Sequence, residues 1–258
     1  MKTKIDIQHL SVEYGRGAER FTALADVSLT VREGEFVCLL GPSGCGKTTL
    51  LNAIAGFERP TSGSLLIDGS PVDGPNPRHT VVFQDYGLLP WRTVERNVGL
   101  GLENRNLSPS GRQQTVDRCL DLVGLTAFRN YYPEQLSGGM RQRIALARAL
   151  AVDPDMLLMD EPFGALDVIT RARMQDELIR IWQTCAKTIV FVTHDIDEAV
   201  YLADRVVIMA PDPGRIKAVK TIDLGRGRDR TSVRFMAERD QILEIFEMKN
   251  YTEVEFYL

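Results

Sequence analysis

One octapeptide constrains this chain more than any other feature. Residues 41–48 read GPSGCGKT, which matches the pattern G-x-x-x-x-G-K-[ST], between the apolar run FVCLL and the helical stretch TTLLNAIAG. Glycines at 41, 44 and 46 would let the backbone turn tightly, with its N–H groups pointing inward at the positive end of the following helix. The segment therefore predicts a strand, a phosphate-binding loop and a helix, in an α/β domain that binds a nucleoside triphosphate.

Two side chains of this octapeptide are needed as well as its backbone. A helix end contributes only about 0.3–1 kcal/mol per charge, whereas micromolar-to-millimolar nucleotide binding needs roughly 4–8 kcal/mol. We therefore expect Lys47 to bind the β- and γ-phosphates and Thr48 to bind Mg²⁺. Cys45 is not required by the pattern, and we expect alkylation of its thiol to block nucleotide binding. The expected phosphate-binding set is Gly41, Pro42, Ser43, Gly44, Cys45, Gly46, Lys47, Thr48 and Thr49.

The composition is that of an ordinary globular chain. Of its 258 residues, 44% are hydrophobic and 26% are charged, and a formal net charge of −4 argues against a nucleic-acid binder. The four cysteines are scattered without a CxxC, which favours reduced cytosolic thiols over disulfides or a metal site. No apolar run approaches the roughly 18–20 residues that span a bilayer. The first ten residues lack the apolar stretch of a secretory signal.

The first seventy residues have the pattern of β-strands. Apolar and polar residues alternate in KIDIQHL and in DVSLTVR, and FVCLL is apolar throughout, which is typical of a strand buried on both faces. Turn signals at Glu33-Gly34 and Asp68-Gly69 predict a hairpin at each place. These patterns predict an N-terminal antiparallel β-subdomain.

Helical periodicity dominates from about 93 to 152, after which strands and helices alternate again. Strands are expected in DMLLMD and TIVFVTHD, and the last thirty residues are expected to form a loop and a helix at about 232–248. The terminal TEVEFYL alternates like a strand without an evident partner. We expect a single domain over 1–258, with a helical insertion at about 92–152 and a short helical tail at about 226–258.

Polar side chains follow two of the predicted apolar strands. Asp160 ends DMLLMD, where we expect it in the Mg²⁺ shell, and Glu161 beside it is expected to polarise an attacking water. General-base assistance of that kind is worth about 10²–10⁴-fold. His194 follows TIVFVT, and the carboxyl ends of neighbouring parallel strands share one edge of a sheet, so we expect His194 to reach the γ-phosphate. Adjacent acids are often only solvated and a lone histidine is more often structural, so these roles depend on the phosphate loop.

A second glycine-containing segment opens another helix. In QLSGGMRQRIALARAL, Ser137, Gly138 and Gly139 precede residues with helical spacing. A serine and two glycines at a helix start can form a second anion-binding cradle. Plain N-capping is the alternative, and it accounts for Ser137 but not for two successive glycines, which are poor helix formers.

These segments together resemble the ATP-binding cassette (ABC) ATPases. LSGGMRQR is similar to the signature motif of that family. In family order, GPSGCGKT, Gln84 in VVFQD, MLLMDE, GALD at 164–167 and His194 resemble the Walker A, Q-loop, Walker B, D-loop and switch-histidine elements. The match covers roughly residues 4–225 and its joint specificity is very high. It implies a P-loop NTPase fold of the ABC nucleotide-binding type that hydrolyses ATP.

The resemblance also implies a head-to-tail homodimer with two ATP molecules at its interface. Each ATP would lie between the phosphate loop of one subunit and Ser137-Gly138-Gly139 of the other, and Asp167 would couple the two sites. Gln84 would reach Mg²⁺ or the attacking water, so the implied metal ligands are Thr48, Gln84 and Asp160. Tyr14 would stack on adenine; Phe21 is a rival, because stacking needs only a π-face.

The wording of the motifs resembles one group of importer ATPases. VVFQDYGLLPWRTVERNV, DEPFGALD and THDIDEAVYLADRVVIM are similar to segments of the taurine, aliphatic sulfonate and nitrate importer ATPases. That resemblance implies a peripheral subunit on the cytoplasmic face of the cell inner membrane, a permease docking near Leu88, Leu89 and Trp91, and a periplasmic or lipid-anchored solute-binding protein acting indirectly. For Leu88, Leu89 and Trp91, a place in the core is the alternative to docking. An importer for another small solute such as a thiamine precursor, a cytosolic ABC ATPase without a transporter and a P-loop kinase are the alternatives.

Overall fold

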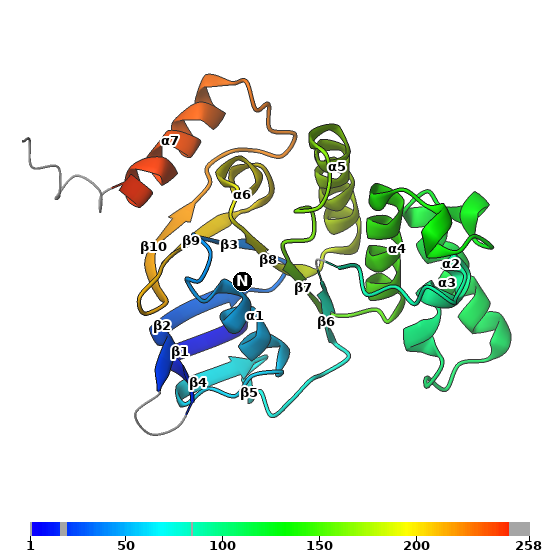
Figure 1. Ribbon diagram of the computed structural model, residues 1–258, viewed down its shortest axis with the longest axis horizontal. Coiled ribbons are helices and arrows are strands. Elements are labelled where there is room, and N and C mark those ends of the chain that lie inside the picture. Colours follow the sequence, from blue (N-terminus) through cyan, green and yellow to red (C-terminus); the bar gives the residue numbers. More distant parts are fainter. Residues whose placement is uncertain (1, 16–19, 84, 248–258) are drawn as a thin grey trace, which may run out of the picture.

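Two β-sheets organise the molecule, which a computed structural model describes at residues 2–15, 20–83 and 85–247 (Figure 1). In this described part, a four-stranded antiparallel sheet has the order β2-β1-β4-β5 and a six-stranded sheet has the order β10-β9-β3-β8-β7-β6. Strands β3, β9, β8, β7 and β6 are parallel, and β10 pairs antiparallel with β9 at one edge. The strands are β1 (Thr3–Tyr14), β2 (Phe21–Arg32), β3 (Phe36–Leu40), β4 (Ser62–Ile67), β5 (Ser70–Pro71), β6 (His79–Val82), β7 (Met156–Asp160), β8 (Thr188–Thr193), β9 (Arg205–Ala210) and β10 (Arg215–Thr221).

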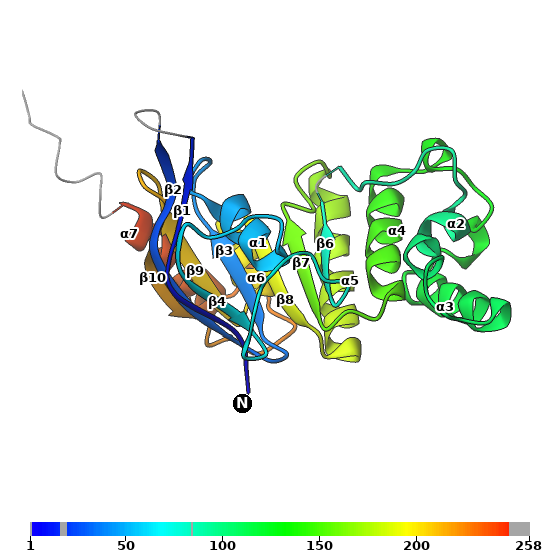
Figure 2. The same cartoon turned by 90° about the horizontal axis from the view of Figure 1, so that it is seen from below.

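Helices cover the six-stranded sheet on both faces. Helix α1 and the antiparallel sheet bury one face of it, and α5 and α6 lie on the other (Figures 1 and 2). This burial on both faces is why β3, β7 and β8 are apolar along almost their whole length. The helices are α1 (Lys47–Ala55), α2 (Val94–Val98), α3 (Pro109–Leu122), α4 (Gly138–Ala151), α5 (Val168–Cys185), α6 (Ile196–Leu202) and α7 (Val233–Glu247).

The turn predicted at Glu33-Gly34 is present, but the hairpin is not. Gly34 has a φ of +75°, and the strands on either side of it enter different sheets. The reason is the apolar run of β3, whose five residues are all buried. A strand of that kind needs a neighbour on each side, and β3 pairs with β8 and β9. The second predicted hairpin is confirmed, because β4 and β5 pair across Asp68-Gly69.

Helices α2, α3 and α4 lie beside one another at the far end of the molecule from the antiparallel sheet (Figure 2). Ser108 is the N-cap of α3, where its hydroxyl accepts a hydrogen bond from the Gly111 N–H at 3.1 Å. Val116 and Leu120 point into the core, as their helical spacing predicted. The loop between β6 and α2 joins these helices to the sheet, and residues 85–91 lie in it.

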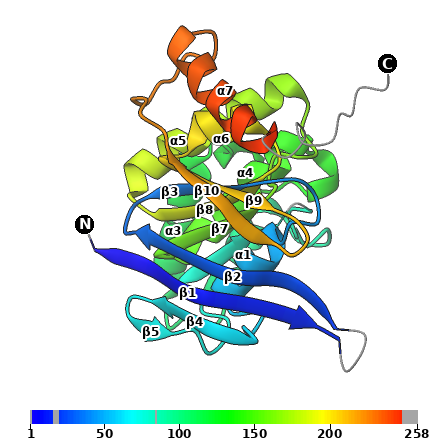
Figure 3. The ribbon, with the colours of Figure 1, turned by 90° about the vertical axis from the view of Figure 1, so that its left-hand side faces the viewer.

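The described part of the chain ends in α7, which lies on the side of the six-stranded sheet away from β1 and β2 (Figure 3). Phe235 and Ile242 anchor this helix in the core that α6 also enters. The TEVEFYL segment, for which a strand pattern was noted, lies outside the described residues. Among the described residues, no helix combines the length and the apolar character that crossing a membrane requires.

Candidate active site

The phosphate loop joins the carboxyl end of β3 to α1, as its sequence predicted. Gly46 is the N-cap of α1 with a φ of +90°, a conformation that other residues rarely adopt. A Cβ atom on Gly46 would lie 2.5 Å from Leu24 Cδ2, and one on Gly41 would lie 2.6 Å from Cys45 Sγ. Glycine is therefore required at both ends of the loop, by packing against β2 at one end and by the buried cysteine at the other.

Lys47 begins helix α1 and is almost fully buried in the loop. Its ammonium donates to the carbonyl oxygens of Gly41 at 2.7 Å and Pro42 at 2.9 Å. These bonds hold a positive charge within the curve of the loop, at the positive end of α1. A compact point charge in this position suits a di- or triphosphate.

Cys45 does not face the site as the alkylation prediction assumed. Its side chain is completely buried in the core between the two sheets, and burial raises the pKa of the thiol. Alkylation requires an accessible thiolate. Burial therefore opposes alkylation of the folded chain, and the effect of alkylation on nucleotide binding stays a prediction.

Thr48 and Asp160 bring two oxygen atoms together from different elements. The Thr48 hydroxyl, in the first turn of α1, donates to Asp160 Oδ1 at the end of β7, at 3.1 Å. Burial raises the pKa of Asp160, and the neighbouring Glu161 charge acts in the same direction. Hydroxyl and carboxylate oxygens are the ligands that Mg²⁺ prefers, and that ion is bound through one or two protein groups together with substrate phosphates. The pair therefore fits a magnesium ion bound with its nucleotide.

Glu161 and His194 meet at the carboxyl ends of β7 and β8. Glu161 Oε2 lies 3.0 Å from His194 Nδ1. The Glu161 backbone has a φ of +42°, and its N–H donates to the carbonyl of Val192 at 3.1 Å. A non-glycine residue in this conformation costs of the order of 1–3 kcal/mol and is found preferentially at functional sites. The strained turn directs the carboxylate out of the sheet toward the histidine.

Two aromatic rings share one wall of the cavity above the phosphate loop. Tyr14 and Phe21 are cross-strand partners on β1 and β2, and both line this cavity of about 400 Å³. Lys47, Thr48 and Glu161 line it as well. The Tyr14 hydroxyl donates to Glu58 at 3.0 Å, so that ring has a polar anchor. Both rings are accessible, and either presents a π-face to an adenine base.

The signature residues open α4, away from the phosphate-loop cavity. The Ser137 hydroxyl accepts a hydrogen bond from the Met140 N–H at 3.3 Å, which is N-capping. A Cβ on Gly139 would lie 2.6 Å from Thr170 Cγ2, so packing against α5 also requires that glycine. A Cβ on Gly138 would make only an ordinary contact, with Leu166 Cδ2 at 3.4 Å. Packing thus explains one of the two glycines.

Asp167 caps the neighbouring helix. Its carboxylate accepts a hydrogen bond from the Thr170 N–H at 3.0 Å. Hydrogen bonding to the Thr170 side chain, and then this backbone bond, lowers the pKa of Asp167. The caps of α4 and α5 are therefore close, because Thr170 also contacts Gly139. None of these residues lines the phosphate-loop cavity of the same chain.

The loop after β6 holds the proposed docking residues. Gln84 lies outside the described residues. Trp91 is 71% exposed, whereas Leu88 is half-buried against the core. Asn97 is fully buried, and its side-chain amide bonds the backbone of Leu89 in both directions, at 2.8 and 3.1 Å.

Arg148, from α4, donates to the carbonyls of Tyr86 and Gly87 and so holds the other half of this loop. Sequence reasoning missed both residues that fix the loop. A polar residue, Asn97, at a buried helical position was the one available signal. Arg148 gave none, because the carbonyl of Tyr86 that it binds lies 62 residues away in the sequence.

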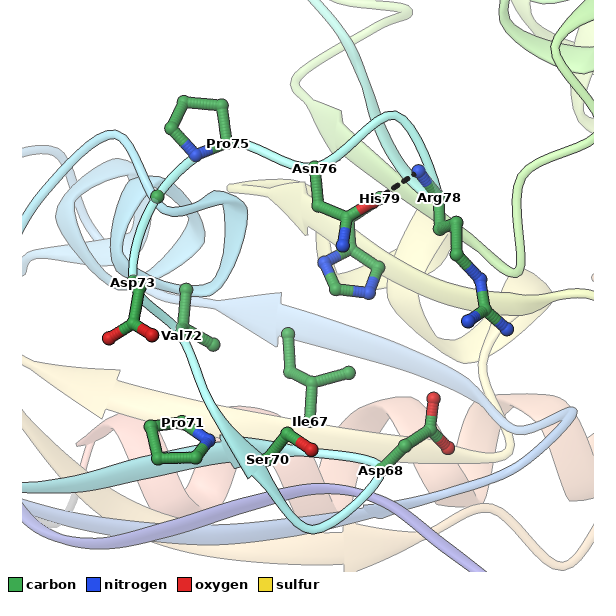
Figure 4. Close-up of a pocket in the computed structure, with 11 residues that line it drawn as sticks. Ile67, Asp68, Ser70, Pro71, Val72, Asp73, Pro75, Asn76, Arg78 and His79 are labelled. Carbon is green, nitrogen blue, oxygen red and sulfur yellow. Dashed lines mark hydrogen bonds between the residues drawn. The ribbon is translucent and has the colours of Figure 1, made fainter.

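A separate cavity of about 440 Å³ lies between the β4–β5 hairpin and the segment before β6 (Figure 4). It contains none of the predicted site residues. Two of its charged groups are paired within the protein: Asp68 binds Lys4 at 2.6 Å, and Arg78 binds Asp155. Burial lowers the pKa of His79 in its wall. The cavity lies where β6 begins, at the opposite end of the strand from the edge that carries Asp160 and His194.

Comparison with known proteins agrees with this geometry. The family model described as "ABC transporter" matches residues 24–164. The nitrate import ATP-binding protein of Synechococcus elongatus is 50% identical over 216 residues, which are 83% of this chain and 79% of that protein. The taurine import ATP-binding protein of Yersinia pestis is 47% identical over 236 residues, which are 88% of this chain and 92% of that one.

A solved structure extends the comparison to three dimensions. It is described as the dimeric post-hydrolysis state of an ATP-binding cassette bound to ADP and Pi. The two chains are 33% identical and superpose with a TM-score of 0.73, over 86% of this chain and 100% of the other.

Proposed function

This chain belongs to the ABC transporter family and hydrolyses ATP, and from that premise we propose that it is the ATPase subunit of a membrane import complex. The observation that carries the site assignment is the convergence of three elements at one edge of the six-stranded sheet. Helix α1 brings Lys47 and Thr48, β7 brings Asp160 and Glu161, and β8 brings His194. Two relatives with import in their names support the transport role.

The nucleotide would bind along the phosphate loop with its base against Tyr14 or Phe21. Thr48 and Asp160 would hold Mg²⁺, with the side chain of Gln84 as a further oxygen ligand. When bound there, the ion would supply positive charge beside the phosphates. Lys47, which already binds two loop carbonyls, would exchange them for phosphate oxygens.

Hydrolysis would then depend on Glu161 and His194. Glu161 accepts a proton from a water molecule as the water oxygen bonds to the γ-phosphorus. The bond from that phosphorus to the β,γ-bridging oxygen breaks, and ADP leaves with the electron pair. In its imidazolium form, His194 donates from Nδ1 to Glu161 and from Nε2 to a γ-phosphate oxygen.

A second copy of the chain completes each site in this proposal. Ser137, Gly138 and Gly139 of one copy would contact the ATP held by the other, and Asp167 would couple the two sites. The dimeric cassette among the structural neighbours supports this arrangement. Within each copy, we propose a helical subdomain at about 92–152 and a C-terminal tail from about 226.

The permease would dock on the loop that carries Leu88, Leu89 and Trp91, at the cytoplasmic face of the membrane. A hydrophobic groove that receives a helix is a known recognition mode. A small anion such as nitrate, taurine or an alkanesulfonate is the proposed solute, delivered by a separate binding protein. The names of the two relatives support that class.

The catalytic assignment is tested with Glu161→Gln. Because the amide cannot accept the water proton, we expect the turnover number to fall by at least about 100-fold. ATP binding and ATP-dependent dimerisation should persist, as measured by equilibrium binding and size-exclusion chromatography. The comparison variant is Lys47→Ala, which should lose ATP binding itself. Full steady-state hydrolysis by Glu161→Gln would refute the role of that residue.

The transport assignment is tested by affinity purification from membranes of the source cell. An importer subunit should bring with it an integral membrane permease in stoichiometric amount. A cytosolic ABC ATPase without a transporter would bring none, and that result would reject the import complex while leaving the ATPase intact.

A further inference from the structure

A chain of buried polar side chains lies directly behind His194. It runs through Gln175 on α5, Glu198 on α6 and Thr193 at the end of β8, which are 4%, 6% and 2% exposed. Arg230, in the segment that leads to α7, begins it. Hydrogen bonds thus connect four separate parts of the sequence, and the last of them reaches Thr193, the residue that precedes His194.

The Thr193 hydroxyl fixes the backbone on both sides of His194. It donates to Glu198 Oε2 at 2.5 Å and accepts a hydrogen bond from the Asp195 N–H at 3.0 Å. Residues 193 and 195 are therefore tied together across the histidine. The Glu198 N–H in turn donates to Asp195 Oδ1 at 3.1 Å, which makes Asp195 the N-cap of α6. The histidine is held between two bonded neighbours.

The remaining bonds converge on Glu198 from the side opposite Thr193. Arg230 donates to Gln175 Oε1, and Gln175 Nε2 donates to Glu198 Oε1 at 2.8 Å. Only one orientation of the Gln175 amide satisfies a guanidinium on one side and a carboxylate on the other. Each donor thus polarises the next, and such chains strengthen cooperatively.

The arginine is itself held in place by α6. Its guanidinium lies 3.9 Å from the centre of the Tyr201 ring, and the Tyr201 hydroxyl donates to Asp176. Two residues earlier, Arg228 is buried and donates to the carbonyls of Tyr201 at 3.2 Å and Ala203 at 2.8 Å. The segment before α7 therefore holds the end of α6 while its last arginine reaches Gln175.

Glu198 is a costly residue for a purely structural position. Among the residues that the structure describes, it has no ion-pair partner, and burial raises its pKa. Removing a carboxylate from water without a cation is expensive, and an apolar side chain of similar volume would often be more stabilising. The cost is understandable where the carboxylate orders a catalytic neighbour.

We propose that Glu198 and Arg230 are positioning residues for ATP hydrolysis, which set the orientation of His194 toward Glu161 through Thr193 and Asp195. This inference rests on the role of His194 in the proposed function. It makes the C-terminal segment 225–232 part of the hydrolytic apparatus, although this segment lies outside every motif that the sequence offered.

The test is Arg230→Met in the purified full-length chain, with Arg234→Met as a matched control on the exposed first turn of α7. We expect Arg230→Met to lower kcat for ATP hydrolysis by about 10- to 100-fold, since small misplacements of a catalytic group have effects of that size. KM for ATP should change less than about twofold, because the phosphate loop is untouched. Arg234→Met should match the wild type in both constants.

A double-mutant cycle separates positioning from a general loss of stability. In the His194→Ala background, Arg230→Met should cause no further loss of kcat, because its effect passes through the histidine. Arg230→Lys, which keeps a donor and a charge, should recover part of kcat. Glu198→Gln is the second variant: its amide would face the Thr193 or Gln175 donor, and it should show the same loss and the same dependence on His194.

The inference is overturned if Arg230→Met and Glu198→Gln keep wild-type kcat, or if their losses multiply with that of His194→Ala. A slow His194→Ala with a normal Arg230→Met rejects only this inference. A wild-type kcat in His194→Ala rejects the catalytic role of the histidine, and the positioning role falls with it.

Discussion

Gly139 makes the tightest predicted contact in the signature segment. A Cβ at this position would lie 2.6 Å from Thr170 Cγ2, a distance that real Cβ atoms essentially never show. Gly138, next to it, has room for a methyl group. The two glycines of LSGG therefore differ: one is required by the packing of α4 on α5, and the other is left for a role at the surface.

This difference predicts opposite results for two similar substitutions. Gly139→Ala should lower the free energy of unfolding by about 1–3 kcal/mol, the usual cost of overpacking. Gly138→Ala should be neutral or slightly stabilising, because alanine is the better helix former. Adding Thr170→Ser to Gly139→Ala removes the clashing methyl group and should recover most of the loss. Urea denaturation of the four proteins measures this, and equal losses for both alanines would contradict the packing explanation.

Individual site residues could be predicted from sequence where a local pattern fixes their surroundings. The phosphate loop and the acids after β7 are of this kind, because a strand, a tight turn and a helix follow one another directly. Arg148 and Glu198 could not be, since each bonds partners whose positions depend on the tertiary fold. The burial of Cys45 could not be predicted for a related reason: the motif leaves its side chain free, and only the packed core determines that it points inward.

At the level of elements, an ionic brace joins the helices beside α4. Arg129 binds Glu95, on α2, at 2.9 Å and Asp117, on α3, at 2.7 Å. The bond from Arg129 is the main reason that the pKa of Glu95 is lowered from its ordinary value of 4.5. A carboxylate with a lowered pKa stabilises the fold above its ordinary pKa and loses that contribution as pH falls through the folded value.

Arg129→Met should therefore destabilise the chain at pH 7 but matter less in acid. The pair is partly exposed, so we expect a loss of no more than about 1 kcal/mol at neutral pH. The difference from the wild type should be constant above about pH 5 and shrink as Glu95 becomes protonated below its ordinary pKa. Urea denaturation from pH 7 to pH 3.5 measures the difference. A gap that widens in acid would show that the brace does not act through this carboxylate.

The order of the strands within the sheets could not be predicted from the individual elements. Each strand near the N-terminus could be recognised from its alternation, and the turn at residues 33 and 34 was correct. Which strands pair was not available locally. The apolar run of β3 indicated burial on both faces, and burial on both faces is incompatible with a simple hairpin to an amphipathic β2. The patterns of β2 and β3 together therefore indicate two separate sheets, although they do not specify which strands pair.

At the level of the whole molecule, Trp91 is a large apolar side chain that the fold leaves in solvent. It is 71% exposed, although the loop that carries it is held from two sides by Asn97 and Arg148. A rigid loop with an exposed aromatic is suited to binding, since little conformational entropy is lost on association. This arrangement supports the docking proposal over the alternative that the tryptophan belongs to the core.

Trp91→Ala should therefore leave the isolated subunit folded and active. We expect its thermal midpoint and ATPase constants to match the wild type, while its affinity for the permease falls by about 30-fold or more, as for an interface hot spot of at least 2 kcal/mol. Val233→Ala, at an 85% exposed position on α7, is the control and should bind normally. Loss of folding in Trp91→Ala would restore the core interpretation.

The attachment of segment 225–232 to α6 also affects which substitutions α6 can tolerate. The contacts of Arg228 with α6 are all to main-chain carbonyls, which every residue possesses. Substitutions along the solvent side of α6 therefore leave this attachment intact. A helix that is held through its backbone can change its exposed side chains, and so its binding partners, without losing its position beside His194.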